Sequence, residues 1–515
     1  MINGHGNSPL LRLVPWLLLT GLLAIIVSCA WSSDDAWITF RTVHNAWMGR
    51  GLTWNPGERV QAYTHPLWML ISLVCYGVTG ELYFSTIATS VAFAGFAVGT
   101  LVWWARETPL VGTCVVFVLA ASGAFVDFAT SGLENALLYL LMVAFVARSA
   151  SRGRPAALGL LGAGVALTRL DAVLLVVPVL VWRFWRERTA RAALLMGALP
   201  LVIWEIFSLI YYGSFVPNTA IAKLNLEIPA DALARQGLLY LADSLVYDPV
   251  TLLATLAAVG VALARGSTVG RLSATGVLCY LAYVVRIGGD FMSGRFLAVP
   301  LITALACVVV DGPPGRWFPA AGGVLALLGL SMPMARWRSG FDYGVGFEAG
   351  RIVRQSGIAD ERAYYYPSTG LLRVLAFRAE IQAAGLPLPP YAGARMGARF
   401  AASADTVAVW NEAGFFGYFA GEKTVVDVWA LGDAFLARIP FHPGAHWRVG
   451  HYEREVPAGY LASRRGGRNV VEDEQLARLY DAVELVVSGP LFTKARWREI
   501  WRLQSGYYAG AGDAR

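Results

Sequence analysis

The sequence predicts a multi-pass α-helical membrane protein with a soluble α/β domain at its C-terminal end. Of its 515 residues, 56% are hydrophobic and only 15% are charged, whereas charged residues make up about a quarter of a typical soluble domain. Apolar stretches long enough to cross a bilayer, about 20 residues each, recur up to residue 334 and are absent from the sequence after it. These observations set the fold class.

Nine apolar stretches each have the length of one membrane span, and their bounds are 11–31, 83–104, 110–126, 133–148, 192–212, 249–265, 272–287, 296–310 and 317–334. A tenth stretch, 156–184, is too long for one span and carries Arg169 and Asp171 at its middle. An isolated charge in hydrocarbon costs several kcal/mol. Two short helices that meet at an aqueous edge avoid this cost, so we expect about eleven spans in all.

The loops between these spans differ in charge. Short cytoplasmic loops hold an excess of Lys and Arg, and the loops 148–155 and 183–191 contain three and four arginines, respectively. This bias predicts a cytoplasmic N-terminus. The loops that then face outward are 32–82, 127–132, 169–171, 213–248 and 287–295.

Eleven spans would bring the chain out on the side opposite its N-terminus, so two domains are expected. Residues 1–335 form the transmembrane catalytic domain, and residues 336–515 form an extracytoplasmic α/β domain. Within the second domain, 423–429 and 482–489 have strand-like sequences, whereas 472–484 has a helical one. The net charge of +7 follows from the loop arginines, and basic patches interleaved with aromatics, which indicate nucleic-acid binding, are absent from the sequence.

Two adjacent carboxylates, Asp34 and Asp35, stand in "SSDDAWITFR" directly after the first apolar stretch. Neighbouring carboxylates repel, so one of them is expected to have a raised pKa unless a cation lies nearby. "SSDD" also suits the start of a helix, where Ser and Asp cap free N–H groups. On the local sequence, a helix cap and a catalytic pair remain equally open.

Polar groups in the other outward loops favour the catalytic interpretation. Basic residues among them suit a phosphate, because Arg offers a two-pronged fork and Lys a point charge. We expect these groups and the aspartates to face one pocket at the outer membrane surface. The expected donor- and phosphate-binding residues are Arg41, His65, Arg169, Lys223, Asp290 and Arg295, and the expected acceptor-binding residues are Glu134, Trp410, Asn411, Asp427 and Trp429.

Several ordered motifs are similar to those of the terminal β-1,2-arabinofuranosyltransferases of actinobacterial cell-wall arabinan, which are membrane glycosyltransferases of the GT-C class. The motifs are "SDDAWITFR", "GLTWNPGERVQAYTHPLW", "SGLENALL", "TRLDAVLL", "GGDFMSGRFLAVP" and "DVWALGDAFLARIP". The resemblance implies a decaprenyl-phosphoarabinose donor and an active site on the outer face of the bacterial plasma membrane. It also implies that the family's catalytic acidic pair corresponds to Asp34 and Asp35. The acceptor is either a glycan or a pilin-like protein.

We expect a single displacement in which Asp34 or Asp35 takes the proton of the acceptor hydroxyl, with Asp34 slightly favoured because it is nearer the membrane exit. Basic groups stabilise the departing phosphate, and a divalent cation at Asp34 and Asp35 is an alternative source of positive charge. Transfer of another polyprenyl-phosphate sugar, such as mannose, is the nearest alternative function. A lipid-linked sugar transporter or flippase should instead carry ionisable groups at the bilayer midplane and repeated halves, and a non-catalytic scaffold would not need such a cluster.

Overall fold

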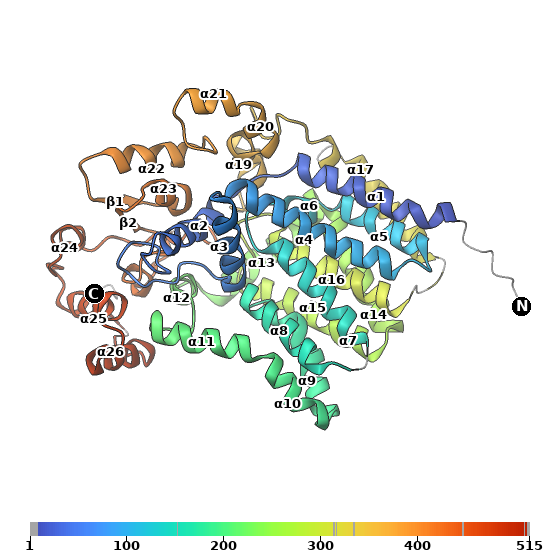
Figure 1. Ribbon diagram of the computed structural model, residues 1–515, viewed down its shortest axis with the longest axis horizontal. Coiled ribbons are helices and arrows are strands. Elements are labelled where there is room, and N and C mark those ends of the chain that lie inside the picture. The colour runs from blue at the N-terminus through green and yellow to red at the C-terminus, as the bar shows by residue number, and fades with distance from the viewer. Residues whose placement is uncertain are drawn as a thin grey trace, which may run out of the picture. The chain divides into compact units, whose positions relative to one another are not determined.

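The computed structural model of the protein describes residues 9–151, 153–312, 315, 317–332, 335–444, 447–508 and 510–511, and these residues are mostly helical (Figure 1). Contacts divide the chain into two compact units. The first comprises Met1–Ser32, Tyr83–Pro200 and Ala230–Leu375, and the second comprises Ser33–Leu82, Leu201–Pro229 and Ala376–Arg515. The second unit therefore joins residues 33–82 and 201–229 to the C-terminal region. The functional division at residue 335 stays a prediction.

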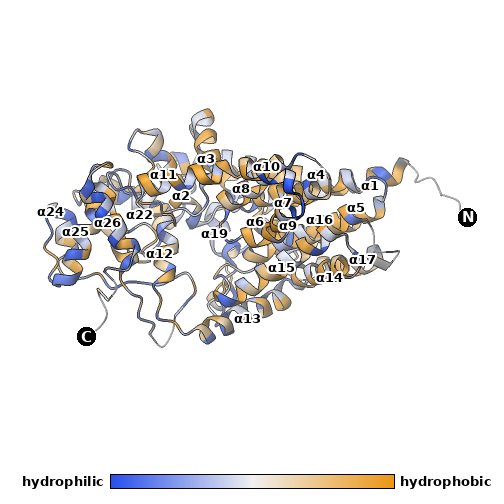
Figure 2. Ribbon diagram, turned by 90° about the horizontal axis from the view of Figure 1, so that it is seen from below, coloured by the Kyte–Doolittle hydropathy of each residue, from blue (hydrophilic) through white to orange (hydrophobic). Residues whose placement is uncertain are grey.

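The first unit is built from helices. Their bounds are α1 Pro9–Ser28, α4 Tyr83–Trp104, α5 Pro109–Ala121, α6 Gly123–Phe128, α7 Asn135–Ala150, α8 Pro155–Thr168, α9 Val173–Arg186, η1 Arg188–Ala190, α10 Arg191–Gly197, α13 Ala230–Tyr247, α14 Pro249–Arg265, α15 Thr268–Arg286, α16 Arg295–Asp311, α17 Trp317–Ser331, η2 Arg336–Arg338, α18 Ala349–Ile352, α19 Glu361–Thr369 and α20 Leu371–Ala376. Helices such as α5, α14 and α16 are predominantly apolar (Figure 2). Helix α16 is buried along most of its length against α7, α14 and α15, and forms the centre of the core.

Candidate membrane spans support a helical membrane protein. Among the described residues, α1, α4 and α15 are long and apolar enough to cross a bilayer, and the number rises to five if each of two bent helix pairs forms one span. The pairs are η1 and α10 with α11 (Leu199–Tyr211), and α13 with α14. Helices α3 (Pro66–Thr79), α5, α7 and α8 are apolar but shorter. The count of eleven spans stays a prediction.

The long apolar stretch 156–184 forms two helices, as expected. Helix α8 ends at Thr168 and α9 begins at Val173. Arg169 lies between them in an extended conformation, and its guanidinium binds the Asp171 carboxylate through two hydrogen bonds of 2.9 and 2.6 Å. The ion pair balances the two charges at the break. This supports the physical reason given for dividing the stretch.

The second unit combines helices with a small sheet. Its elements are α2 Asp34–Trp47, α3 Pro66–Thr79, α11 Leu199–Tyr211, α12 Asn218–Leu224, α21 Arg378–Ala383, α22 Ala392–Ala402, β1 Val407–Trp410, α23 Ala413–Phe419, β2 Thr424–Asp427, η3 Leu436–Arg438, α24 Tyr460–Gly466, α25 Glu474–Ser488 and α26 Lys494–Gln504. The strands β1 and β2 are parallel, and the register pairs Val407 with Thr424 and Trp410 with Asp427. Their carboxyl ends therefore meet at one edge.

The strand expected at 482–489 is instead the end of α25. The Asp473 carboxylate caps this helix by accepting the N–H groups of Gln475 and Leu476. Buried apolar residues then follow at helical spacing, including Leu476, Leu479, Val483 and Val487. The cap and this periodicity outweigh the β-branched composition of "AVELVVSG".

Gly159 and Gly197 let α8 and α10 approach backbone to backbone. A Cβ on Gly159 would lie 2.2 Å from the Leu194 carbonyl oxygen, and one on Gly197 would lie 2.1 Å from the Ala156 carbonyl oxygen. Neither backbone can yield as a flexible side chain would. We expect Gly159→Ala to lower the thermal unfolding temperature of the purified protein.

Gly260 in α14 is the matched control, because a Cβ there would meet no atom of the described residues within 4 Å. Alanine is favoured over glycine in a helix by about 1 kcal/mol, so Gly260→Ala should leave the unfolding temperature unchanged or raised. An equal response of the two variants would contradict this account of the α8–α10 contact.

Candidate active site

Asp34 joins the start of α2 to the start of α23. Its Oδ1 accepts the N–H of Phe415 at 2.7 Å, and its Oδ2 accepts the N–H of Gly414 at 2.9 Å. A Cβ on Gly414 would lie only 1.8 Å from the Asp34 carbonyl oxygen, so glycine alone permits this approach. Burial, together with the charge of Glu412, raises the pKa of the Asp34 carboxyl to about 8. Both oxygens of this side chain are committed to the α2–α23 contact.

Asp35 differs from its neighbour in exposure. Asp34 is only 6% exposed, whereas Asp35 is half-buried. Thr39 follows Asp35 by one helical turn and so lies on the same face of α2. The Thr39 hydroxyl is hydrogen-bonded to Nε2 of His65 at 2.7 Å. The second unit thus brings His65 beside the Asp35 face of α2.

Glu412 adds a third carboxylate that the sequence interpretation did not single out. It lies just before α23, two residues after the end of β1, is half-buried, and accepts a 2.8 Å hydrogen bond from the Tyr391 hydroxyl. Its charge acts on Asp34. Nothing within the described ranges forms a group of three or more His, Cys, Asp or Glu side chains placed to hold a metal ion. A signal for Glu412 was present, because residues after parallel strands gather at one edge.

The expected acceptor residues around the strand ends have different surroundings. The Trp410 ring stacks on Phe416 at 4.3 Å, as a packing residue does, while Asn411 is exposed. Asp427 is fully buried, and its two oxygens accept the N–H groups of Trp429 and Gly432, each at 2.9 Å. Burial raises the pKa of Asp427 to about 7. Asp427 therefore shapes the loop that follows β2.

That loop presents Trp429 at the surface. Ala430 has φ +59°, a left-handed conformation that alanine rarely adopts, so the surrounding contacts must hold it. The Asn218 amide supplies them by donating to the carbonyl oxygens of Ala430, Leu431 and Asp433 at 2.9 to 3.2 Å. Trp429 itself is half-buried. The loop is thus a fixed platform for one aromatic side chain.

Basic side chains lie beside this platform. The Trp429 ring contacts the His451 ring edge-on at 4.4 Å, and Nη1 of Arg448 lies 2.9 Å from Nε2 of His451. Burial, reinforced by the charges of Arg448 and Lys223, lowers the pKa of His451 to about 3, so its neutral ring accepts the Arg448 N–H. Lys223 is exposed. We call Lys223, Trp429, Arg448 and His451 the Trp429 subsite.

Arg41 lies in the interior of the second unit. Its guanidinium stacks over Trp54 at 4.6 Å, and its Nη2 donates to the Lys423 carbonyl oxygen at 2.7 Å and to Asn55 Oδ1 at 3.2 Å. Burial lowers the pKa of Arg41 to about 9. Its Nε and Nη1 have no hydrogen-bond partner in the described part of the chain. These contacts suit a packing role better than an open phosphate site.

The first unit gathers the other expected residues into one ionic cluster. The Arg169 and Arg295 guanidiniums both approach Oε1 of Glu134, at 3.2 and 3.3 Å. Arg295 also lies 3.7 Å from Asp290, and Arg169 pairs with Asp171. Three carboxylates thus surround two guanidiniums. The cluster brings together residues expected to bind the donor phosphate and one expected to bind the acceptor.

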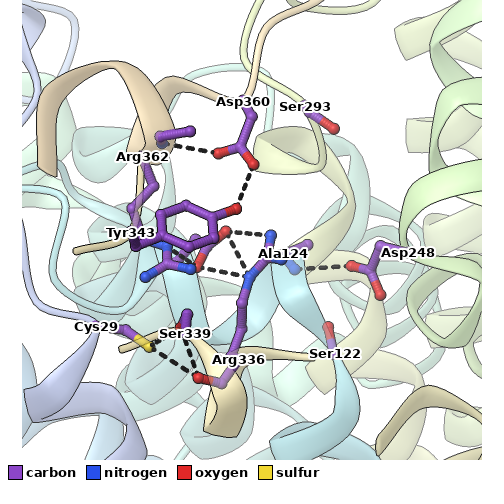
Figure 3. Close-up of polar contacts among 12 residues, drawn as sticks. Cys29, Ser122, Ala124, Asp248, Ser293, Arg336, Ser339, Tyr343, Asp360 and Arg362 are labelled. Carbon is purple, nitrogen blue, oxygen red and sulfur yellow. Dashed lines mark hydrogen bonds and ion pairs between the residues drawn. The ribbon is translucent and has the colours of Figure 1, made fainter. Parts of the chain in front are cut away.

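A second buried ionic network in the first unit was not expected from the sequence (Figure 3). Arg336 binds both oxygens of Asp127, and Nε of Arg362 lies 2.8 Å from the same carboxylate. The Tyr343 hydroxyl donates to Asp360 at 2.5 Å. Arg362 is 1% exposed and Asp360 is 5% exposed, so these charges lie in the interior. The opposite charges of the network balance one another there. The network ties residues 336–362 to α6, which contains Asp127.

Comparisons with known proteins agree with the resemblance that the motifs indicate. The chain is 29% identical over 433 residues to a terminal β-(1→2)-arabinofuranosyltransferase of Mycobacterium tuberculosis, a match that covers 70% of this chain and 67% of the relative. It is 32% identical over 341 residues to a protein of the same name from Corynebacterium glutamicum, covering 54% of this chain and 48% of the relative. The chain thus spans about half the length of the second relative.

No protein-family model and no solved structure matches the chain. Both relatives carry the name of a glycosyltransferase, which supports the prediction that the chain is an enzyme of that class. The resemblance to terminal β-(1→2)-arabinofuranosyltransferases, predicted from the motifs, is confirmed.

Proposed function

We propose that the chain transfers arabinofuranose from decaprenyl-phosphoarabinose, or a close polyprenyl relative, to a glycan outside the bacterial plasma membrane. The likeness to two arabinofuranosyltransferases, extending over 433 residues in one of them, carries this proposal. A pilin-like protein is the alternative acceptor. The apolar helices support a donor delivered by the bilayer.

We assign the general base to Asp35 rather than to Asp34. The hydroxyl of the acceptor attacks the anomeric carbon, and the bond from that carbon to the phosphate oxygen breaks with its electron pair leaving on the polyprenyl phosphate. Asp35 takes the hydroxyl proton. Two observations support this choice: Asp35 is half-buried, whereas the oxygens of Asp34 accept the N–H groups of α23.

Asp34 then acts as a positioning residue. Its contacts with Gly414 and Phe415 set the direction in which α2 begins, and Asp35 is the next residue of that helix. Nearby, Thr39 and His65 border the same face of α2. This division of roles does not require a metal ion at the pair, since an acceptor hydroxyl needs only a base.

The donor phosphate is assigned to the Trp429 subsite. Lys223 is exposed, and the charges of both Lys223 and Arg448 act on His451. Positive charge is therefore available to stabilise the negative charge that develops on the leaving group. Trp429 offers an aromatic face for a sugar ring. Arg169 and Arg295 are weaker candidates, because Glu134, Asp171 and Asp290 already balance their charge.

The sugar is tested with membranes that contain the expressed protein and a set of radiolabelled polyprenyl-phosphate sugars. We expect label to move from the arabinofuranose donor to a glycan, and not from a mannose donor. Transfer of mannose alone would contradict the sugar assignment, and label on a protein band would replace the glycan as the acceptor.

The base is tested by Asp35→Asn, which keeps the shape of the side chain and removes its basicity. Turnover should fall by a factor of about 10²–10⁴, the usual contribution of a general base, while donor binding is kept. Asp405→Asn, at an exposed position before β1, is the control and should retain full turnover. Wild-type turnover of the Asp35→Asn enzyme would refute the assignment.

The phosphate assignment is tested by Lys223→Ala. Loss of one charge-assisted contact should raise the KM for the lipid donor by roughly tenfold with little change in kcat. The exposed Lys494 of α26 in the same unit provides the matched control Lys494→Ala. If both variants show the wild-type KM, Lys223 does not bind the donor.

A further inference from the structure

A cavity lined by none of the candidate site residues lies in the first unit, where α7 ends, α8 begins and α9 is followed by η1 and α10. Its volume is about 230 Å³. Arg148 and Arg183 line it together with Glu187 and Thr189, and Leu158 and Leu194 close its apolar side. The lining residues therefore combine positive charge with hydrocarbon.

Arg183 is built into the wall of this cavity. It is only 8% exposed, its Nη2 donates to the Ser149 carbonyl oxygen at 2.7 Å, and its Nη1 pairs with Glu187. Its Nε has no hydrogen-bond partner among the residues that the structure describes. A buried N–H without an acceptor lowers the stability of the folded protein, so an acceptor atom of a ligand at this place would stabilise it.

The surroundings add positive charge. Arg154, Arg186 and Arg188 lie at the ends of α8, α9 and η1, and all three are exposed. Arg152, in the same loop as Arg154, lies outside the described residues. Among the described residues that line the cavity, Glu187 is the single carboxylate. The charge of this region suits an anion.

Large apolar side chains flank the same region. Trp185 is 69% exposed and Met196 is 66% exposed. Trp182 and Trp185 precede the arginines at the end of α9, and Trp beside Arg is typical of the boundary between membrane and water. The ligand should therefore have an anionic head and a hydrocarbon body.

We propose that this cavity binds the phosphate of an anionic phospholipid headgroup. The phosphate oxygens accept N–H groups of Arg183 and its neighbours, while the acyl chains lie along the apolar surface of α10. A zwitterionic headgroup fits less well, because its ammonium would approach the same arginines. This site is independent of the reaction proposed above, and its predicted role is to fix the ends of α7, α8 and α9 at the membrane surface.

The test measures the thermal unfolding temperature of the delipidated full-length protein in neutral detergent with phosphatidylglycerol or phosphatidylcholine added. A ligand of the folded state raises this temperature, so phosphatidylglycerol should raise it and phosphatidylcholine should not. The variant Arg154→Gln/Arg186→Gln/Arg188→Gln changes exposed side chains only, and it should lose at least half of the rise. Native mass spectrometry should show correspondingly less phosphatidylglycerol retained.

The control variant Arg106→Gln/Arg271→Gln removes exposed arginines elsewhere in the first unit and should keep the full rise. A full rise in the triple variant, or an equal loss in the control, would overturn the site. Inorganic phosphate is tested separately at millimolar concentration. If it produces the same rise, the cavity is a site for a free anion and the lipid assignment falls.

Discussion

The contact between the Asp34 carboxylate and the N–H groups of Gly414 and Phe415 constrains the rest of the candidate site. It joins two segments 380 residues apart in the sequence. Aromatic packing supports it, because the Trp37 ring stacks on Phe415 at 4.7 Å one turn further along α2. With α2 fixed in this way, Asp35 and Thr39 turn to the adjacent face, where His65 is bound.

The same constraint also positions the edge of the small sheet. Two residues separate the end of β1 from the start of α23, and Glu412 is the second of them. Holding the first turn of α23 against Asp34 therefore also restrains the end of β1 and the position of Glu412. The parallel register then aligns Trp410 with Asp427, from which the Trp429 loop begins. Asp427, Ala430 and Asn218 thus serve to present a single aromatic ring. The left-handed backbone of Ala430 costs stability, and strained loops of this kind are common at functional sites.

Some of this was predictable from the sequence and some was not. The cost of a charge in hydrocarbon predicted a break near Arg169, and the structure has this break between α8 and α9. The Asp pair was singled out because two adjacent carboxylates directly follow an apolar stretch, and its catalytic role stays a prediction. Glu412 was missed because the only signal for it was its place after a strand, and its approach to Asp34 depends on a contact between distant segments of the chain. The end of α25 was misassigned because β-branched residues suit both a strand and a buried helix face.

The central claim is that Asp35 is the base and Asp34 holds the helix that presents it. Rescue by added formate tests this most directly, because a small carboxylate can replace a lost base but not a lost structural contact. Formate should restore arabinose transfer to Asp35→Ala in a concentration-dependent way and leave Asp34→Ala inactive. Rescue of Asp34→Ala but not of Asp35→Ala would contradict the account.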